Sequence, residues 1–139
     1  PYFGIIASDI SRAALTIAKT GLYPQRKVEL VDQHYRETYF TSQENGRFQV
    51  IPELKEKICF NHANVLNISE LPSIKLDVIL CQNMLIYFRR WLRHEILNAF
   101  VERLKPGGIL VIGLGEVVDW VHRDIKRVAA DDVQVYMRT

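Results

Sequence analysis

The sequence contains 139 residues, of which 48% are hydrophobic and 24% are charged, a composition ordinary for one globular domain. Its 18 basic and 16 acidic side chains leave a formal net charge of +2, which gives no support to a nucleic-acid-binding protein. No apolar run approaches the ~18 residues of a membrane span, and the amino terminus lacks a signal-peptide pattern. We therefore expect a cytoplasmic protein without membrane insertion.

The cysteines and histidines suggest neither a disulfide framework nor a metal centre. Cys59 and Cys81 lie in apolar, strand-like stretches, so buried and reduced thiols are expected. The four histidines are scattered with no neighbouring ligand at metal spacing. We predict no metal site.

The chain opens on a predicted strand, Phe3–Ala7, with only two residues in front of it. A domain rarely starts on a central strand, so we expect the sequence to be part of a larger domain. Asp9 follows the strand, and the pattern then predicts a helix over residues 12–20. Ser11 suits the N-cap of this helix, and Gly21 suits the position just beyond its end.

Asp9 has two candidate roles. A carboxylate at the end of a strand and just before a helix can accept two hydrogen bonds from the vicinal hydroxyls of a ribose. The alternative is a capping role near the positive end of the helix that follows. Its position in the sequence is compatible with either role.

Residues 25–57 interrupt the alternation of strands and helices. One or two short helices are predicted between Val28 and Tyr39. The Asn45-Gly46 pair then lies between aromatic and β-branched runs, which is a strong hairpin signal. We interpret this segment as a small antiparallel insertion.

The second half of the chain returns to a regular alternation and ends in two strands. The predicted elements are strands at residues 58–63, 76–81 and 109–114, a loop at Leu71-Pro72-Ser73, a helix of about four turns between Leu92 and Leu104, a tight turn at Lys105–Gly108, and a closing antiparallel pair at residues 124–128 and 133–137. This order predicts an α/β fold of the Rossmann-like methyltransferase type, with a mostly parallel sheet that finishes in an antiparallel hairpin.

The stretch Leu80–Phe88 carries the clearest chemical signal. Gln82 and Asn83 follow a buried strand at the point where an open parallel sheet binds its ligands, and Tyr87 comes four residues later. The alternative is that the two amides only turn the chain and that Tyr87 packs.

This stretch resembles the signature of the CheR-type chemoreceptor glutamate methyltransferases, F/L-C-R-N-x-L/M-I-Y-F. Three more segments resemble that family in the right order. They are Ala7–Ser11 with Ala14 to Tyr23, which is similar to its ATDI…L..A..G.Y segment; Asn64–Leu66, which is similar to its NLL segment; and Leu104–Gly108 with Gly113 and Gly115-Glu116, which is similar to its LKPGG.L..GhsE segment. A chance match over four ordered segments is improbable.

The resemblance implies an S-adenosylmethionine-dependent enzyme that forms glutamyl methyl esters on the cytoplasmic coiled coil of a chemoreceptor. The pilus-associated chemosensory branch is one candidate placement within the family. The resemblance also implies that Tyr87 is the catalytic residue, and that the cofactor contacts Asp9, Asn64, Val65, Gln82 and Asn83.

Two departures from the family pattern affect these expectations. Gln82 stands where typical members have arginine, and a neutral amide has neither the charge nor the bidentate fork of arginine. The family's glycine-containing cofactor loop and its helical domain would both precede Pro1. We therefore expect the isolated chain to be inactive, and its open sheet edges to favour a dimer.

Two other functions remain open. A non-catalytic receptor-binding module of the same fold is motivated by Gln82. A nucleic-acid methyltransferase would carry an Asn/Asp-Pro-Pro-aromatic turn, whereas Asn83 is followed by Met84-Leu85, and no basic stripe with interleaved aromatics is present.

Overall fold

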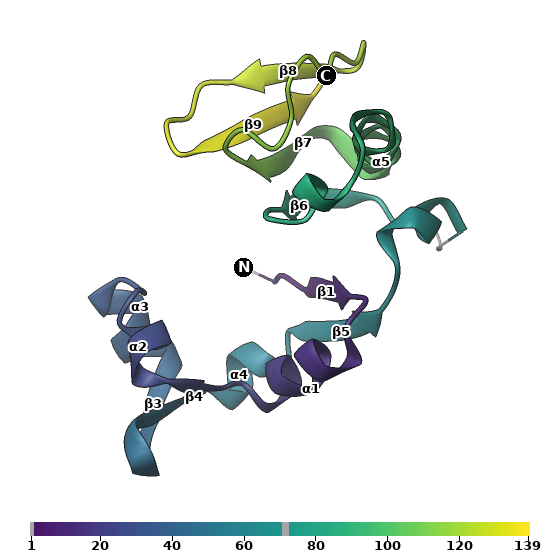
Figure 1. Cartoon of the computed structure of the whole chain (residues 1–139). Helices are drawn as coiled ribbons and strands as arrows, with labels where there is room; N and C mark the ends of the chain where they lie inside the picture. Colours follow the sequence, from purple (N-terminus) through teal and green to yellow (C-terminus); the bar gives the residue numbers. More distant parts are fainter. Residues whose placement is uncertain (1, 71–72) are drawn as a thin grey trace. The chain divides into compact units, whose positions relative to one another are not determined.

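The computed structural model describes residues 2–70 and 73–139, which form two compact units that divide between Asn64 and Val65 (Figure 1). Most of the loop predicted at Leu71-Pro72-Ser73 lies outside the described residues. Among the described residues, no helix combines the length and apolar character needed to cross a bilayer.

The first unit is built on two parallel strands, β1 (Ile5–Asp9) and β5 (Ile58–His62), which pair in register from Ile5 with Ile58 to Asp9 with His62. Helix α1 (Arg12–Thr20) connects out of β1. The Ser11 side chain accepts the N–H of Ala14 at 3.2 Å, and Gly21 has the left-handed φ of 64° that ends the helix. Both predicted ends of this helix are confirmed.

An antiparallel sheet interrupts the first unit, as predicted. It has the strand order β2-β4-β3, with Asn45 (φ 59°) and Gly46 (φ 66°) in the connection between β3 and β4, where these residue types tolerate a left-handed backbone. The insertion starts earlier than predicted because residues 22–24 pair with β4. Its elements are β2 (Leu22–Pro24), α2 (Gln25–Val28), α3 (Gln33–Tyr39), β3 (Phe40–Gln43), the 3-10 helix Glu44–Gly46, β4 (Arg47–Val50) and α4 (Pro52–Lys55).

The second unit is a four-stranded mixed sheet with the order β6-β7-β9-β8. Strands β6 and β7 are parallel, and β9 pairs antiparallel with both β7 and β8, so the predicted closing pair is confirmed (Figure 1). The elements are the 3-10 helix Val65–Glu70, β6 (Leu76–Cys81), the 3-10 helix Leu85–Tyr87, α5 (Arg90–Arg103), β7 (Leu104–Gly113), β8 (Ile125–Val128) and β9 (Val133–Arg138).

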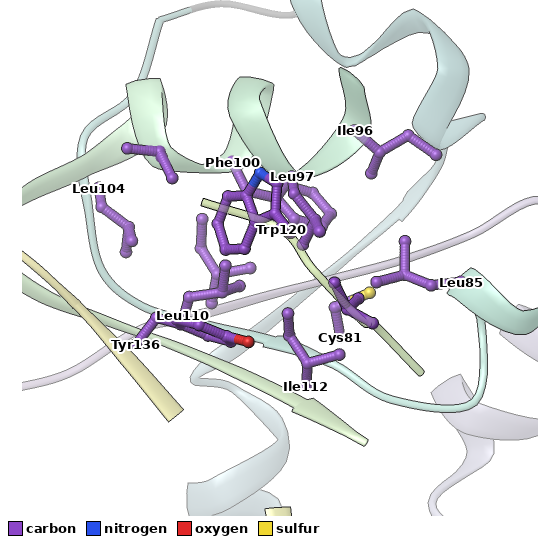
Figure 2. Packing of buried hydrophobic residues seen from close by; sticks show 13 residues of the cluster. Cys81, Leu85, Ile96, Leu97, Phe100, Leu104, Leu110, Ile112, Trp120 and Tyr136 are labelled. Carbon is purple, nitrogen blue, oxygen red and sulfur yellow. The ribbon is translucent and has the colours of Figure 1, made fainter. Parts of the chain in front are cut away.

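The hydrophobic core of the second unit lies between α5 and its sheet (Figure 2). Leu97 of α5 and Leu110 of β7 are fully buried, and Trp120 packs edge-on against Tyr136 with ring centroids 5.1 Å apart. Burial of each large apolar side chain stabilises the fold by about 1.5–3 kcal/mol. This core holds the strands whose ends carry the candidate site.

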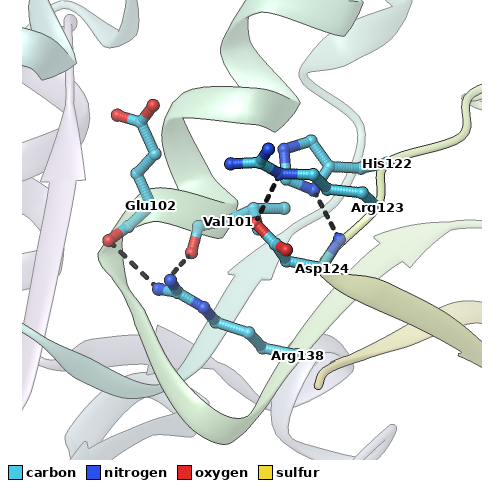
Figure 3. A network of polar contacts seen from close by, with 6 residues as sticks. All are labelled: Val101, Glu102, His122, Arg123, Asp124 and Arg138. Atoms are coloured by element: carbon cyan, nitrogen blue, oxygen red, sulfur yellow. Dashed lines mark hydrogen bonds and ion pairs between the residues drawn. The ribbon is translucent and has the colours of Figure 1, made fainter.

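Arg138, near the end of β9, satisfies the carboxyl end of α5 (Figure 3). Its Nη1 donates to the carbonyls of Val101 at 2.9 Å and Glu102 at 3.3 Å, and also to that of Leu104. The last carbonyls of a helix lack partners within the helix, and a cation there also complements the helix dipole. Strand β9 therefore adds a side-chain cap to the backbone cap that the Leu104 N–H already provides.

The turn predicted at Lys105–Gly108 is a bulge inside β7. The pairing with β6 jumps from Leu76–Leu104 to Val78–Ile109. A Cβ on Gly108 would lie 2.8 Å from the carbonyl oxygen of Lys105, so only glycine fits there.

The two cysteines differ, against the expectation that both are buried. Cys81 is 6% exposed in the core of the second unit, whereas Cys59 of β5 is exposed. In the part of the chain that the structure describes, the sheet that contains Cys59 has two strands, and none of their residues is buried.

Candidate functional site

In the first unit, the candidate residues lie at the carboxyl ends of β1 and β5. Asp9 is the last residue of β1 and pairs with His62, the last residue of β5, and Asn64 follows two residues later. The N–H of Ala63 donates to the carbonyl oxygen of Asp9 at 3.1 Å, which ties the two strand ends together. Asp9 and Asn64 thus share one edge of this sheet.

The Asp9 carboxylate has a capping contact and remains exposed. Its Oδ1 accepts the N–H of Ser11 at 2.7 Å, next to the start of α1. No described residue donates to its Oδ2. The carboxylate can therefore stabilise the entry to the helix and still accept hydrogen bonds from the hydroxyls of a ligand.

Asn64 and Val65 stand on either side of the division between the units. Val65 begins a 3-10 helix and is half-buried against the core of the second unit. Each unit consequently contains part of the predicted cofactor-binding set.

In the second unit, the candidate residues lie on the segment 82–88, which we call the tyrosine turn. Leu85 is fully buried and Phe88 packs partly against the core, and between them Tyr87 is 80% exposed. Tyr87 therefore does not pack on the core of this unit. Gln82 is also exposed, at the end of β6, and Asn83 has a left-handed φ of 57°.

A buried carboxylate from the neighbouring parallel strand holds the tyrosine turn. Glu116 follows the end of β7 and is only 3% exposed. Its Oε1 accepts the N–H of Asn83, and its Oε2 accepts the N–H of Leu85 at 3.1 Å. In the sequence, Glu116 appears only as the last letter of a family-like motif. The signal that could have found it is an acid just beyond the strand parallel to β6.

Arg93 of α5 holds the other end of the tyrosine turn. Its guanidinium donates from Nε to the carbonyl of Phe88 at 2.7 Å, from Nη1 to that of Glu116 at 2.8 Å, and from Nη2 to that of Ile86 at 3.3 Å. Planar, forked donors suit such a cluster of carbonyls. Sequence reasoning missed this role as well, because helical periodicity places Arg93 among the solvated charges.

Cys81 directly precedes the tyrosine turn, but it is not a nucleophile. Burial and, to a smaller extent, the nearby Glu116 carboxylate together raise the pKa of its thiol to about 12. The thiol is neutral at physiological pH and acts as a small apolar side chain.

Within residues 2–70 and 73–139, no group of three or more His, Cys, Asp or Glu side chains is arranged to hold an ion.

Comparison with known proteins identifies the family. Residues 1–134 match the family model described as CheR methyltransferase, SAM binding domain. Chemotaxis protein methyltransferase 2 of Vibrio cholerae is 34% identical over 113 residues, which cover 81% of this chain and 39% of that protein. Chemotaxis protein methyltransferase Cher2 of Pseudomonas putida is 34% identical over 116 residues, which cover 83% of this chain and 42% of that protein.

Solved structures support the same fold. The N-methyltransferase NodS from Bradyrhizobium japonicum, solved with S-adenosyl-L-homocysteine, has a TM-score of 0.59 at 12% identity and covers 97% of this chain and 66% of that one. Magnesium protoporphyrin IX methyltransferase from Synechocystis, solved with bound SAM, has a TM-score of 0.55 at 12% identity and covers 98% of this chain and 60% of that one. The predicted Rossmann-like methyltransferase fold is confirmed.

The chain spans about two fifths of the length of the curated relatives that it matches. Within that span, the family model covers nearly all of its residues, and the motifs noted in the sequence fall at the ends of the strands observed in the structure. The chain belongs to the CheR methyltransferase family, in its SAM-binding domain.

Proposed function

We propose that this chain is the cofactor-binding part of a methyltransferase that forms glutamyl methyl esters on the cytoplasmic coiled coil of a chemoreceptor. The observation that carries the proposal is the exposed Tyr87, held on a firmly bonded turn at the carboxyl end of β6 in a chain of the CheR family. Relatives at 34% identity are named chemotaxis protein methyltransferases, which supports both the reaction and the kind of substrate.

The proposed cofactor is S-adenosylmethionine, and the residues at the strand ends suit it. The exposed carboxylate of Asp9 can accept hydrogen bonds from ribose hydroxyls, and Asn64 and Val65 can contact the adenine. Gln82 and Asn83 offer amide groups at the end of β6. In this proposal the five residues form the cofactor contacts that the family resemblance implies.

The chemistry asks little of the protein beyond orientation. S-adenosylmethionine supplies a methyl group activated by a sulfonium, and a glutamate side chain is already ionised at pH 7, so no general base is required. Holding the two reactants in line can lower the barrier by up to ~7–11 kcal/mol. Tyr87 can donate a hydrogen bond to the substrate carboxylate and present its ring to a cation, a contact of about 0.5–2 kcal/mol.

We further propose that residues outside this chain complete the pocket. Among the described residues, strand β6 pairs only with β7, and its apolar side chains Val78 and Leu80 are 52% and 74% exposed. In the first unit, Ile6 of β1 is 51% exposed. Parallel strands are normally covered on both faces. Further residues packed on each of these strands would cover these side chains, and without them we expect copies of the chain to self-associate through the open edges.

A second candidate function is a receptor-binding module without catalysis. The observation that favours it is Gln82, because an uncharged amide cannot replace the charge of the family's arginine at that position. Methyl transfer to a receptor is expected from the enzyme and not from the binding module.

The test is methyl transfer from radiolabelled S-adenosylmethionine to a chemoreceptor of the same organism, using the longest protein that contains this chain. Base-labile methyl esters on receptor glutamates are expected, and Tyr87→Phe is expected to lower kcat by about tenfold or more. Receptor binding without any methyl ester would select the non-catalytic module instead. Gln82→Arg in the same assay measures what the departure at this position costs.

A further inference from the structure

We infer that Glu116 is a positioning residue for methyl transfer, and that its buried carboxylate holds the backbone of the tyrosine turn so that Tyr87 faces the reacting groups. The inference rests on the function proposed above. Glu116 itself touches neither substrate nor cofactor in this account, because its side chain is buried and both of its carboxylate oxygens are bonded to the turn.

The Glu116 carboxylate is buried, and burying a carboxylate costs free energy. An unpaired buried charge is strongly unfavourable, so a carboxylate that is 3% exposed must have strong partners. Its partners are two backbone N–H groups from one short segment, and charge-assisted bonds of this kind are stronger than neutral ones. The contact therefore fixes this segment more firmly than an ordinary loop contact would.

The two hydrogen bonds of Glu116 are made at two distinct points of the tyrosine turn, Asn83 and Leu85. Asn83 has a left-handed backbone, a conformation that asparagine tolerates better than most residues other than glycine, and the first bond falls at this change of direction. Leu85 is the first residue of the 3-10 helix that contains Tyr87, and N–H groups at a helix start lack partners within the helix. The carboxylate thus fixes both the change of direction after β6 and the start of the helix.

Glu116 is itself held in place by its surroundings. A Cβ on Gly113 would lie 2.9 Å from the Glu116 Cδ, so the side chain folds back over a glycine that leaves room for it. The next residue, Val117, donates its N–H to Gln134 Oε1 at 3.2 Å and accepts from Gln134 Nε2 at 2.9 Å. Arg93 bonds the Glu116 carbonyl from the helix side. Strands β7 and β9 and helix α5 together support one carboxylate.

The position of Tyr87 should affect the rate of methyl transfer. A displacement of about 1 Å at a reacting group can cost about 100-fold in rate. Loosening the tyrosine turn should therefore lower kcat and also weaken the proposed cofactor contacts of Gln82 and Asn83, whereas the contact at Asp9, in the other unit, stays in place. A residue needed only for folding would lower the amount of active protein and leave the kcat of the folded fraction unchanged.

The main test is Glu116→Gln in the longest protein that contains this chain. The two side chains have the same shape, but the amide would point an NH₂ donor at one of the two backbone N–H groups. We expect kcat to fall by about tenfold or more, the KM for S-adenosylmethionine to rise by a smaller factor, and the amides of Asn83 and Leu85 to exchange with solvent at least about tenfold faster. Glu95→Gln, the same change at an exposed position of α5, is the matched control and should alter none of these.

Two further measurements make the test decisive. Glu116→Gln should lower kcat far less in a Tyr87→Phe background, because the carboxylate acts through that side chain. Amide exchange in the unsubstituted protein requires neither activity nor a stable variant, and it should show slow exchange at Asn83 and Leu85.

Three outcomes would overturn the inference: rapid exchange at these amides in the unsubstituted protein, unchanged exchange in Glu116→Gln, or additive effects of the two substitutions on kcat. A protein that shows the slow exchange but transfers no methyl group would instead refute the proposed enzyme function.

Discussion

The two units differ sharply in how much of their apolar sequence they bury. Between residues 2 and 64, only Leu15 and Val28 are buried apolar side chains, whereas the second unit encloses a continuous core (Figure 2). Both units contain apolar parallel strands of similar length, β1 and β6. The difference shows that an apolar, strand-like sequence is not enough for burial. The side chains of a strand are buried only where other elements pack on its faces.

The second unit should consequently tolerate core truncation much less than the first tolerates truncation of its strands. Leu97→Ala, at a fully buried position of α5, is expected to lower the free energy of unfolding of the second unit by about 2–5 kcal/mol. Ile6→Ala, in a strand where that side chain is 51% exposed, should cost below about 1 kcal/mol. Urea unfolding followed by site-resolved hydrogen exchange measures both. Equal costs would contradict the contrast between the units.

Burial of Cys81 should make the free energy of unfolding of the second unit depend on pH. Burial favours the neutral thiol of Cys81 and raises its folded-state pKa to about 12. The stability it contributes is therefore fully present below about pH 9 and is lost as the pH rises toward 12, at up to ~1.4 kcal/mol per pH unit. Unfolding titrations between pH 8 and 11 should show a shallower decline for Cys81→Ala. A slope for Cys81→Ala equal to that of the unsubstituted chain would contradict the assignment.

Local capping should matter in the first unit because little core supports its helix. Ser11→Ala removes the side-chain acceptor for the Ala14 N–H and is expected to cost about 1 kcal/mol. The effect should appear as faster amide exchange throughout α1. Ser42→Ala, at an exposed position of β3, is the matched control. No change in α1 would mean that packing, and not the cap, sets the stability of this helix.

The smallest effect is expected at one surface ion pair of the second unit, that between Lys105 and Asp77. Lys105 Nζ lies 2.9 Å from Asp77 Oδ1, with 48% and 79% of the two side chains exposed. Lys105→Met should change the free energy of unfolding by under about 1 kcal/mol, and less at high salt. A loss as large as that of Leu97→Ala would show that the bulge of β7 depends on this pair.

Sequence reasoning succeeded where the signals are local. The ends of α1, the Asn45-Gly46 hairpin and the length of α5 each follow from residues close together in the chain, whose turn and capping preferences act over a few positions. The placement of Asp9 and the tyrosine turn at carboxyl strand ends follows from the general behaviour of parallel sheets.

The contacts that hold the candidate site could not be read from the chain. Glu116 reaches Asn83 across 33 positions, and the contact depends on β6 and β7 pairing in parallel with a bulge between them. Arg93 looks like a solvated helix charge until the carbonyls of the tyrosine turn come within its reach. Similarly, the exposure of Cys59 follows from the width of its sheet and not from its neighbours in the sequence.

The strand order of the second unit also bears on how the chain folds during synthesis. Strand β9 lies between β7 and β8 in the sheet but is made after both of them. A nascent chain that has released β8 from the ribosome still has no strand for β8 to pair with, and the carboxyl end of α5 still lacks Arg138. The sheet of this unit should therefore stay incomplete until β9 has left the exit tunnel. Nascent chains stalled before residue 133 should be protease-sensitive.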